Sequence, residues 1–109
     1  MGEVLLLLAT LATPPDCSAL AGWNSGRRGA IAVAECADET YQEGYRLGDA
    51  LKELQDERDD IARDLPTLTV EAGSAARRRQ RQIDIDLEAI RGLATIKAWP
   101  LDPPPEPSP

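Results

Sequence analysis

Apolar residues recur at helical spacing through the middle of the chain. Successive positions lie 4, 3, 4, 3, 4 and 3 residues apart, which is the heptad pattern of a helix with one narrow apolar seam. The positions are Leu47, Leu51, Leu54, Arg58, Ile61, Leu65 and Leu68, so one charged residue interrupts the series. Asp38 is a suitable N-cap, and Pro66 disfavours helix at the residue before it. The pattern predicts a helix over about residues 38–65.

A second apolar stripe follows in the last third of the chain. Ile83, Leu87, Ile90 and Ala94 are spaced 4, 3 and 4 residues apart, and Leu93 and Ile96 widen the stripe. With Ser74 as its cap and Pro100 beyond its end, this helix is predicted over about residues 74–98. The short connection, residues 66–73, implies an antiparallel helical hairpin. Its predicted core is Leu47, Leu51, Leu54, Ile61, Leu65, Ile83, Leu87 and Ile90.

Opposite charges flank the two predicted helices. One helix carries Asp56, Glu57, Asp59, Asp60 and Asp64, and the other carries Arg77, Arg78, Arg79 and Arg81. Folding the chain near residue 70 makes the two runs face each other, which favours a salt-bridged flank. A phosphate or nucleic-acid patch is the alternative for the arginines. The net charge of −7 argues against a general nucleic-acid binder and against docking on anionic lipid.

The N-terminus has the features of an export signal. Val4 to Ala12 form an apolar run that is too short to span a bilayer, and small residues at its end suit cleavage. The first three residues contain an acid and no basic residue, which is unusual for such a signal. We expect a signal peptide at residues 1–12, a single helical domain at 13–99, and no transmembrane span after signal removal. A buried N-terminal helix or strand of a cytosolic protein is the alternative.

The chain contains two cysteines, Cys17 and Cys36, and no histidine. In a small exported protein, two cysteines usually form a disulfide, so that pairing is predicted here. Two separate buried thiols are the alternative. Lipidation of Cys17 is disfavoured because Pro14, Pro15 and Asp16 precede it, where small residues are normally needed. The ligand set is too small for a structural zinc site, and no metal or cofactor is predicted.

A glycine–aromatic–x–x–glycine pattern occurs twice, as GWNSG at residues 22–26 and GYRLG at residues 44–48. Two glycines four residues apart remove the side chains from one face of a helix and allow another backbone to come close. The pattern predicts a tight helix crossing, with the aromatic residues packed beside it. A platform for a glycan or peptide ligand is the alternative. The residues concerned are Gly22, Trp23, Gly26, Gly44, Tyr45 and Gly48.

The last ten residues, 100–109, contain six prolines. Such a segment is expected to be extended or disordered and to contribute nothing to a core, and the same expectation covers Trp99 before it. An inert tail is the simplest interpretation. A polyproline ligand, or a semi-rigid spacer toward a wall or membrane, is the functional alternative.

The residues needed for catalysis are scarce. Without histidine, the common acid–base pairs and catalytic triads are unavailable. Asp84, Asp86 and Glu88 resemble the start of a calcium loop. However, Ala89 stands where that loop needs glycine, and Thr95 stands where it needs glutamate. The sequence contains no phosphate-binding glycine loop, nucleophile elbow or dinucleotide fingerprint, so no enzyme activity is predicted.

Residues Cys36 to Leu65, CADETYQEGYRLGDALKELQDERDDIARDL, resemble a family of small bacterial envelope proteins catalogued as domain of unknown function 2799. Members of that family combine a cysteine, an aromatic and glycine-containing segment, and a charged helix similar to a coiled coil. Many of them look like lipoproteins with more cysteines than this chain has. The resemblance implies a bacterial envelope location and no particular activity.

Together these patterns predict an all-α protein, periplasmic or secreted, with a disulfide-tied N-terminal segment on a long antiparallel hairpin. A structural or protein-interaction role is expected, with another protein or a second copy binding through the helical seam. An acidic inhibitor or immunity-type protein that masks a basic target is one alternative function. A phage-type component for envelope disruption is another.

Overall fold

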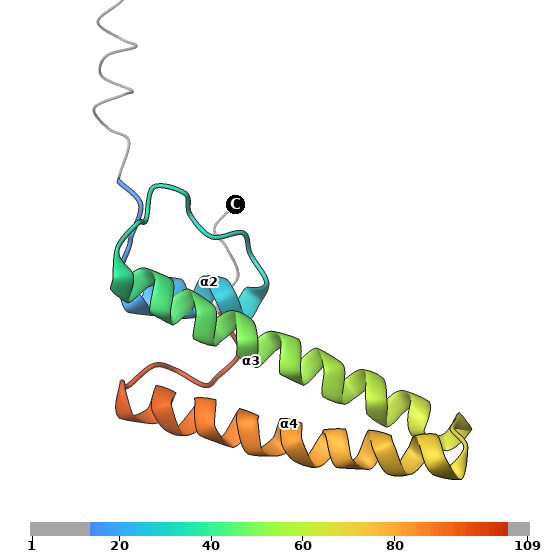
Figure 1. Ribbon diagram of the computed structural model, residues 1–109. Coiled ribbons are helices and arrows are strands. Elements are labelled where there is room, and N and C mark those ends of the chain that lie inside the picture. The colour runs from blue at the N-terminus through green and yellow to red at the C-terminus, as the bar shows by residue number, and fades with distance from the viewer. Residues whose placement is uncertain (1–13, 105–109) are drawn as a thin grey trace, which may run out of the picture.

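The computed structural model describes residues 14–104, which form three α-helices and one short 3-10 helix and contain no strand. Figure 1 shows two long helices lying side by side, with a short helix across one end of the pair. The predicted all-α class is therefore confirmed. The predicted signal peptide, residues 1–12, and the end of the tail, residues 105–109, lie outside the described residues.

The first described helix, α2, runs over Ala19–Arg28. Ser18 is its N-cap, and the Ser18 hydroxyl accepts a hydrogen bond from the Ala21 amide at 3.1 Å. Gly29 ends the helix in the left-handed conformation, with φ of 72°, which glycine adopts at little cost. A loop then leads back to the start of the next helix, so α2 and α3 form a connected pair.

Helix α3 runs over Glu39–Asp64, close to the predicted range of 38–65. Asp38 occupies the N-cap position, although its side chain makes no capping hydrogen bond. Pro66 lies in the 3-10 helix η1, Leu65–Thr67, which follows directly. The proline thus ends the α-helix where the sequence predicts, and the chain reverses within a single turn.

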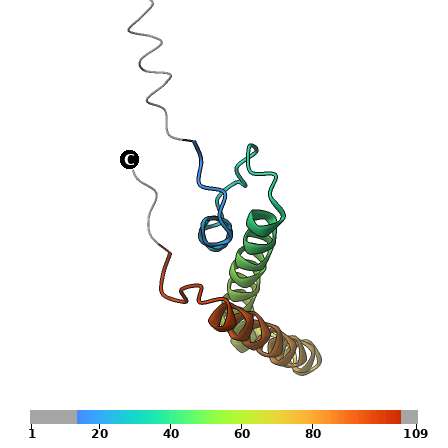
Figure 2. The ribbon, with the colours of Figure 1, turned by 90° about the vertical axis from the view of Figure 1, so that its left-hand side faces the viewer.

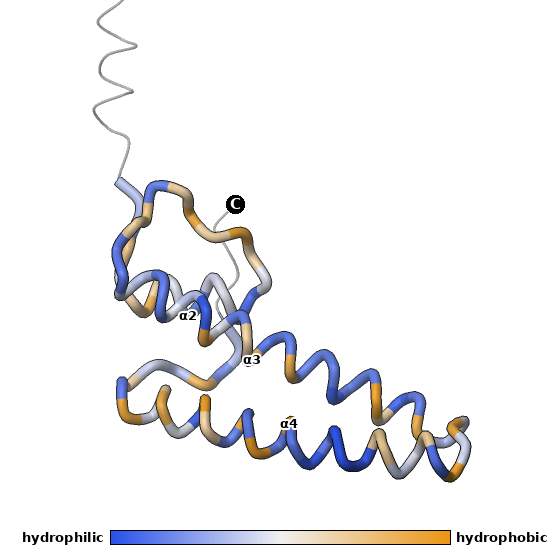
Figure 3. Tube along the Cα trace, viewed as in Figure 1, coloured by the Kyte–Doolittle hydropathy of each residue, from blue (hydrophilic) through white to orange (hydrophobic). Residues whose placement is uncertain are grey.

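Helix α4 runs over Val70–Ile96, and its start differs from the prediction. Thr69 is the N-cap rather than Ser74, because its hydroxyl accepts the Ala72 amide at 3.2 Å. The predicted connection of residues 66–73 is therefore too long, since its second half is already helical. Helices α3 and α4 run antiparallel, which confirms the hairpin. They lie close together near η1 and diverge toward the start of α3 (Figures 1 and 3).

The main core lies where α2 crosses the hairpin. Its buried residues come from every helix and from the segment after α4, and they are Trp23, Leu51, Ile83, Leu87, Ala94 and Trp99. Four further predicted core residues, Leu47, Leu54, Ile61 and Ile90, are partly buried and pack against this cluster. Leu65 is half-buried near the turn of the hairpin.

Two residues assigned to the α4 stripe were placed wrongly by sequence reasoning. Leu93 is 37% exposed and Ile96 is 82% exposed, so neither widens the buried stripe. The buried stripe of α4 is narrower than predicted, because the core covers only one side of this helix. It consists of Ile83, Leu87, Ile90 and Ala94. Among the described helices, none is both long and apolar enough to cross a membrane.

Candidate interaction surface at the helix crossing

The crossing of α2 and α3 is built on four glycines. Gly22 and Gly26 of α2 face α3, and Gly44 and Gly48 of α3 face α2. A Cβ atom at any of the four would lie closer than 3.0 Å to backbone atoms of the opposite helix. The two repeated motifs are therefore brought together in space, each providing the flat face against which the other packs.

Trp23 lies at the centre of the core. Its side chain is fully buried in the same cluster as Leu51 of α3 and Ile83 and Leu87 of α4. Trp23 was predicted to pack beside the crossing, and in the structure it also joins α2 with both helices of the hairpin. Trp23 can contact both hairpin helices because its side chain projects from the side of α2 that adjoins the glycine face.

Two tyrosines of α3 hold the loop that connects α2 to α3. The Tyr45 hydroxyl donates a hydrogen bond to the Ala30 carbonyl at 2.6 Å, and the Tyr41 hydroxyl accepts one from the Val33 amide at 2.9 Å. Their rings are stacked with centroids 6.3 Å apart. Sequence reasoning selected Tyr45 and missed Tyr41, which is the more deeply buried of the two. Their spacing of four residues, which places both on one helix face, was the available signal.

The predicted disulfide between Cys17 and Cys36 is confirmed. The two Cα atoms are 5.2 Å apart, and Cys36 is fully buried. The bridge joins the residue just before the Ser18 cap to the loop just before α3. The Cys36 carbonyl also accepts a hydrogen bond from Gln42 Nε2 at 3.0 Å. The bridge therefore joins the N-terminal ends of α2 and α3, at one end of the crossing.

The segment after α4 contradicts the expectation that the chain from Trp99 onward contributes nothing to a core. Trp99 is buried and stacks on Trp23 with ring centroids 5.2 Å apart. The indole N–H of Trp23 donates to the Pro100 carbonyl at 2.8 Å. Residues 100–103 are themselves exposed, and they contact α2 through the carbonyls of Pro100 and Asp102. Figure 2 shows this segment passing beside α2.

The reversal after α4 depends on Ala98. Its φ of 59° is the one positive value at a non-glycine residue in the described chain. The Trp99 amide donates to the Ala94 carbonyl at 2.8 Å, and the Ala98 amide donates to the Thr95 carbonyl at 3.1 Å. This is the hydrogen-bond pattern of a Schellman cap, in which the turned residue is usually glycine. The cap directs Trp99 back onto the core.

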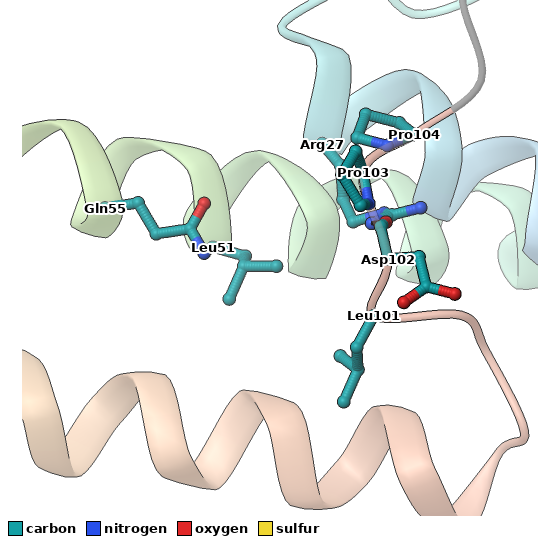
Figure 4. Close-up of a pocket in the computed structure, with 7 residues that line it drawn as sticks. All are labelled: Arg27, Leu51, Gln55, Leu101, Asp102, Pro103 and Pro104. Carbon is teal, nitrogen blue, oxygen red and sulfur yellow. Dashed lines mark hydrogen bonds between the residues drawn. The ribbon is translucent and has the colours of Figure 1, made fainter.

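Arg27 of α2 is buried beneath the same segment, with 8% of its surface exposed. Its Nη1 donates to the Asp102 carbonyl, its Nη2 donates to Asn24 Oδ1 at 2.8 Å, and its guanidinium lies 5.4 Å from the Trp23 ring centre. Burial lowers the pKa of Arg27, and the nearby Asp102 carboxylate opposes that shift. Its Nε is buried and has no hydrogen-bond partner among residues 14–104. Arg27 and the cavity it lines, of about 230 Å³, were missed by sequence reasoning (Figure 4).

The outer part of the hairpin is held by charged pairs. Glu57 accepts two hydrogen bonds from Arg79, at 2.6 and 2.8 Å, and these lower the pKa of Glu57. Arg58, the charge that interrupts the apolar seam, reaches Asp84 of α4 at 3.0 Å. From the predicted basic run, Arg79 is the residue that pairs with the acidic stretch across the hairpin. The seam thus accommodates Arg58 because its partner comes from the opposite helix.

The residues that resemble a calcium loop serve other contacts. Asp84 pairs with Arg58, and Asp86 accepts a hydrogen bond from Gln82 at 3.0 Å on the same helix. Within residues 14–104, no group of three or more His, Cys, Asp or Glu side chains is arranged to hold a metal ion.

A scan against protein-family models, a search of curated proteins and a search of solved structures each found no match to this chain.

Proposed function

We propose that this chain is an exported helical protein, periplasmic or secreted, with a structural or protein-binding role and no catalytic activity. The observation that carries the proposal is the Cys17–Cys36 disulfide, because disulfides persist in oxidising compartments and are rare in the cytosol. The apolar run at residues 4–12 and the resemblance of residues 36–65 to a family of bacterial envelope proteins support the same location.

A binding role is supported by the outer face of α4. Ile85, Ala89, Gly92 and Ile96 follow one another at spacings of 4, 3 and 4 residues along this face. Ile85 is 61% exposed and Ile96 is 82% exposed, and the space around Gly92 is open. Two exposed isoleucines on one helix face, with only alanine and glycine between them along that face, leave a smooth surface that suits contact with another protein.

The first test is the intact mass of the protein expressed with its own N-terminus in a bacterium. Periplasmic and cytosolic fractions are compared, with and without reductant, after alkylation of free thiols. Export predicts a periplasmic species that lacks about 12 residues and whose two cysteines react only after reduction. A full-length cytosolic species with two free thiols would refute the proposed location.

The second test concerns the binding role. A photo-crosslinking amino acid is placed at Ile85 or at Ile96, and at the exposed Asp59 of α3 as a control. A protein partner on the outer face of α4 predicts a discrete cross-linked product from the two isoleucine positions and none from the control. Identical patterns from all three positions would argue against this face as a binding surface.

A further inference from the structure

The segment that follows α4 lies against α2, and the cavity beside it is also lined by Leu51 and Gln55 of α3; we call this site the groove. Two donors on α2, one turn apart, bind its backbone: Trp23 Nε1 donates to the carbonyl of Pro100, and Arg27 Nη1 donates to the carbonyl of Asp102. The two carbonyls lie on either side of Leu101, and the chain bends at Asp102. Trp99 stacks on Trp23 ahead of these contacts.

An aromatic ring and side-chain donors to backbone carbonyls are also groups by which proteins recognise Pro-rich segments. A Pro-rich chain has fixed φ angles, few backbone donors and no internal hydrogen bonds, so its carbonyls are free for donors on an aromatic surface. Aromatic-lined grooves with indole or other side-chain donors bind such segments with little loss of conformational entropy. The contacts at Pro100 and Asp102 involve backbone carbonyls, and they therefore suit any segment of this class.

The chain's own segment leaves part of the site unfilled. The cavity of about 230 Å³ lies beside Arg27, between Leu51 and Gln55 of α3 and the segment at residues 101–104. Figure 4 shows the side chains of Leu51 and Gln55 extending from α3 toward that segment. Arg27 is more than nine-tenths buried, and its Nε has no partner among the described residues. A buried donor without a partner is unfavourable, so an occupant that supplies an acceptor here would bind more tightly.

We propose that this groove, formed by Trp23, Arg27, Leu51 and Gln55, binds a Pro-rich segment of a partner protein, one with an aromatic residue ahead of its prolines. The chain's own Trp99–Pro104 occupies the groove in the free protein and competes with the partner. This inference goes beyond the proposed binding role on the outer face of α4, because it concerns a second site on the molecule.

The chain's own segment and an added peptide compete for the same groove, and this competition determines the affinity expected for the peptide. A tethered segment has an effective concentration of roughly millimolar, so an added peptide binds the intact protein weakly. Weakening the tethered segment without altering the groove should therefore strengthen binding of an added peptide. Trp99→Ala removes the stacked ring, and Trp99→Phe keeps a smaller ring on Trp23 and preserves more of the fold.

The test uses the full, oxidised chain and a fluorescein-labelled synthetic peptide with the sequence of residues 99–109. Fluorescence anisotropy should give peptide affinity in the order Trp99→Ala, then Trp99→Phe, then wild type, with at least a roughly tenfold difference between the first and the last. Added unlabelled peptide should also raise the thermal midpoint of Trp99→Ala and leave that of the wild type unchanged. If Trp99→Ala does not fold, the peptide affinity of Trp99→Phe is compared with that of the wild type instead.

Groove and control variants are made in the Trp99→Phe background. Arg27→Gln should reduce peptide binding at least about tenfold, because a shorter, neutral amide replaces the guanidinium that donates to the carbonyl at Asp102. Arg46→Gln, at an exposed position of α3, removes the same charge outside the groove and should leave binding unchanged. A peptide in which the residues corresponding to Pro103 and Pro104 are alanine should bind less tightly.

Three results would overturn the inference. One is equal, weak binding to all folded variants. Another is equal loss of binding in Arg27→Gln and Arg46→Gln, which would reflect charge alone. The third is a dimer of Trp99→Phe that exchanges its own segments and binds no added peptide. Any of these results, together with successful cross-linking at Ile85 and Ile96, would reject peptide binding in the groove. The proposed binding role of the outer face of α4 would then remain. Failure of both experiments would reject both.

Discussion

The two interfaces of α3 are built in opposite ways. Its N-terminal half meets α2 through glycines, and the two backbones touch without side chains between them. Its C-terminal half meets α4 through partly buried leucines and isoleucines, flanked by ion pairs such as Glu57–Arg79. The crossing adds a disulfide and a pair of stacked tryptophans, whereas the outer hairpin has only its apolar seam and surface charges.

This difference teaches how a chain with few large apolar residues can still form a defined structure. Close backbone contact gains dispersion energy over many atoms and leaves no freedom for side chains to adjust. A seam of long side chains can adjust, and exposed ion pairs contribute little to stability. We therefore expect the crossing to tolerate almost no substitution and the outer hairpin to tolerate many.

The largest expected effect comes from adding a single methyl group at the crossing. Gly48→Ala places a Cβ against the backbone of α2 and should lower the free energy of unfolding by about 3 kcal/mol or more. Gly92→Ala is the matched control, because its Cβ meets nothing within 4 Å. Gly92→Ala should raise the free energy of unfolding by up to about 1 kcal/mol through helix propensity. Urea denaturation followed by circular dichroism measures the free energy of unfolding of both variants. If the two substitutions changed it in the same direction, close backbone packing at Gly48 would be contradicted.

Removing the disulfide should have the next largest effect. The bridge joins residues 19 positions apart, and loop closure of that length contributes about 3 kcal/mol in the chain-entropy model. The double variant Cys17→Ser, Cys36→Ser should lose about that much stability, and reduction of the wild type should reproduce the loss. If the oxidised wild type and the double variant had the same urea midpoint, the bridge would not constrain the crossing.

A smaller effect is expected at the cap that returns the chain to the core. Ala98→Gly should raise the free energy of unfolding by about 1 kcal/mol, because glycine adopts φ of 59° without the penalty of a Cβ. Ala89→Gly, at an exposed position inside α4, should lower it by about 1 kcal/mol. Thermal denaturation of the two variants should thus shift in opposite directions. Destabilisation by both would mean that the left-handed turn at residue 98 does not form in solution.

The smallest effect is expected in the outer hairpin. Hydrogen bonds from Arg79 lower the pKa of Glu57 below the ordinary value of 4.5. The contribution of this pair to stability is therefore present above about pH 4.5 and is lost as the pH falls through the lower, folded-state value. A pH titration followed by NMR should find the lowered pKa at low salt, and Arg79→Gln should return it toward 4.5. A Glu57 pKa that did not respond to this substitution would contradict the pairing.

Much of the framework could be predicted because it depends on local patterns. The apolar spacing from Leu47 to Leu65 located α3, and Pro66 located its end. The start of α4 was misjudged because Thr69 and Ser74 are both good N-caps, and local preference alone does not choose between them. Leu93 and Ile96 were misplaced because the width of a buried stripe depends on how much of the helix its neighbour covers.

The candidate interaction surface was only half predictable. The two glycine motifs indicated a crossing, since the absence of side chains at four-residue spacing is visible in the sequence. The roles of Tyr41, Arg27 and Trp99 were missed. Each depends on contacts with a distant segment: Tyr41 with the loop at Val33, Arg27 with Asp102, and Trp99 with Trp23. One signal for the role of Trp99 was available in the sequence. It is a large aromatic residue at the start of an otherwise polar and Pro-rich end.

The sequence by itself determined the helical class, the hairpin, the glycine faces and the two cysteines available for pairing. These follow from periodicity, helix-ending residues and composition, all of which act between residues that are close along the chain. Only the tertiary structure decided that the segment after α4 belongs to the core, that Arg27 is buried beneath it, and that Arg58 finds a partner in Asp84. Those outcomes depend on which surfaces remain uncovered after the helices have packed, and short-range sequence patterns carry no information about that.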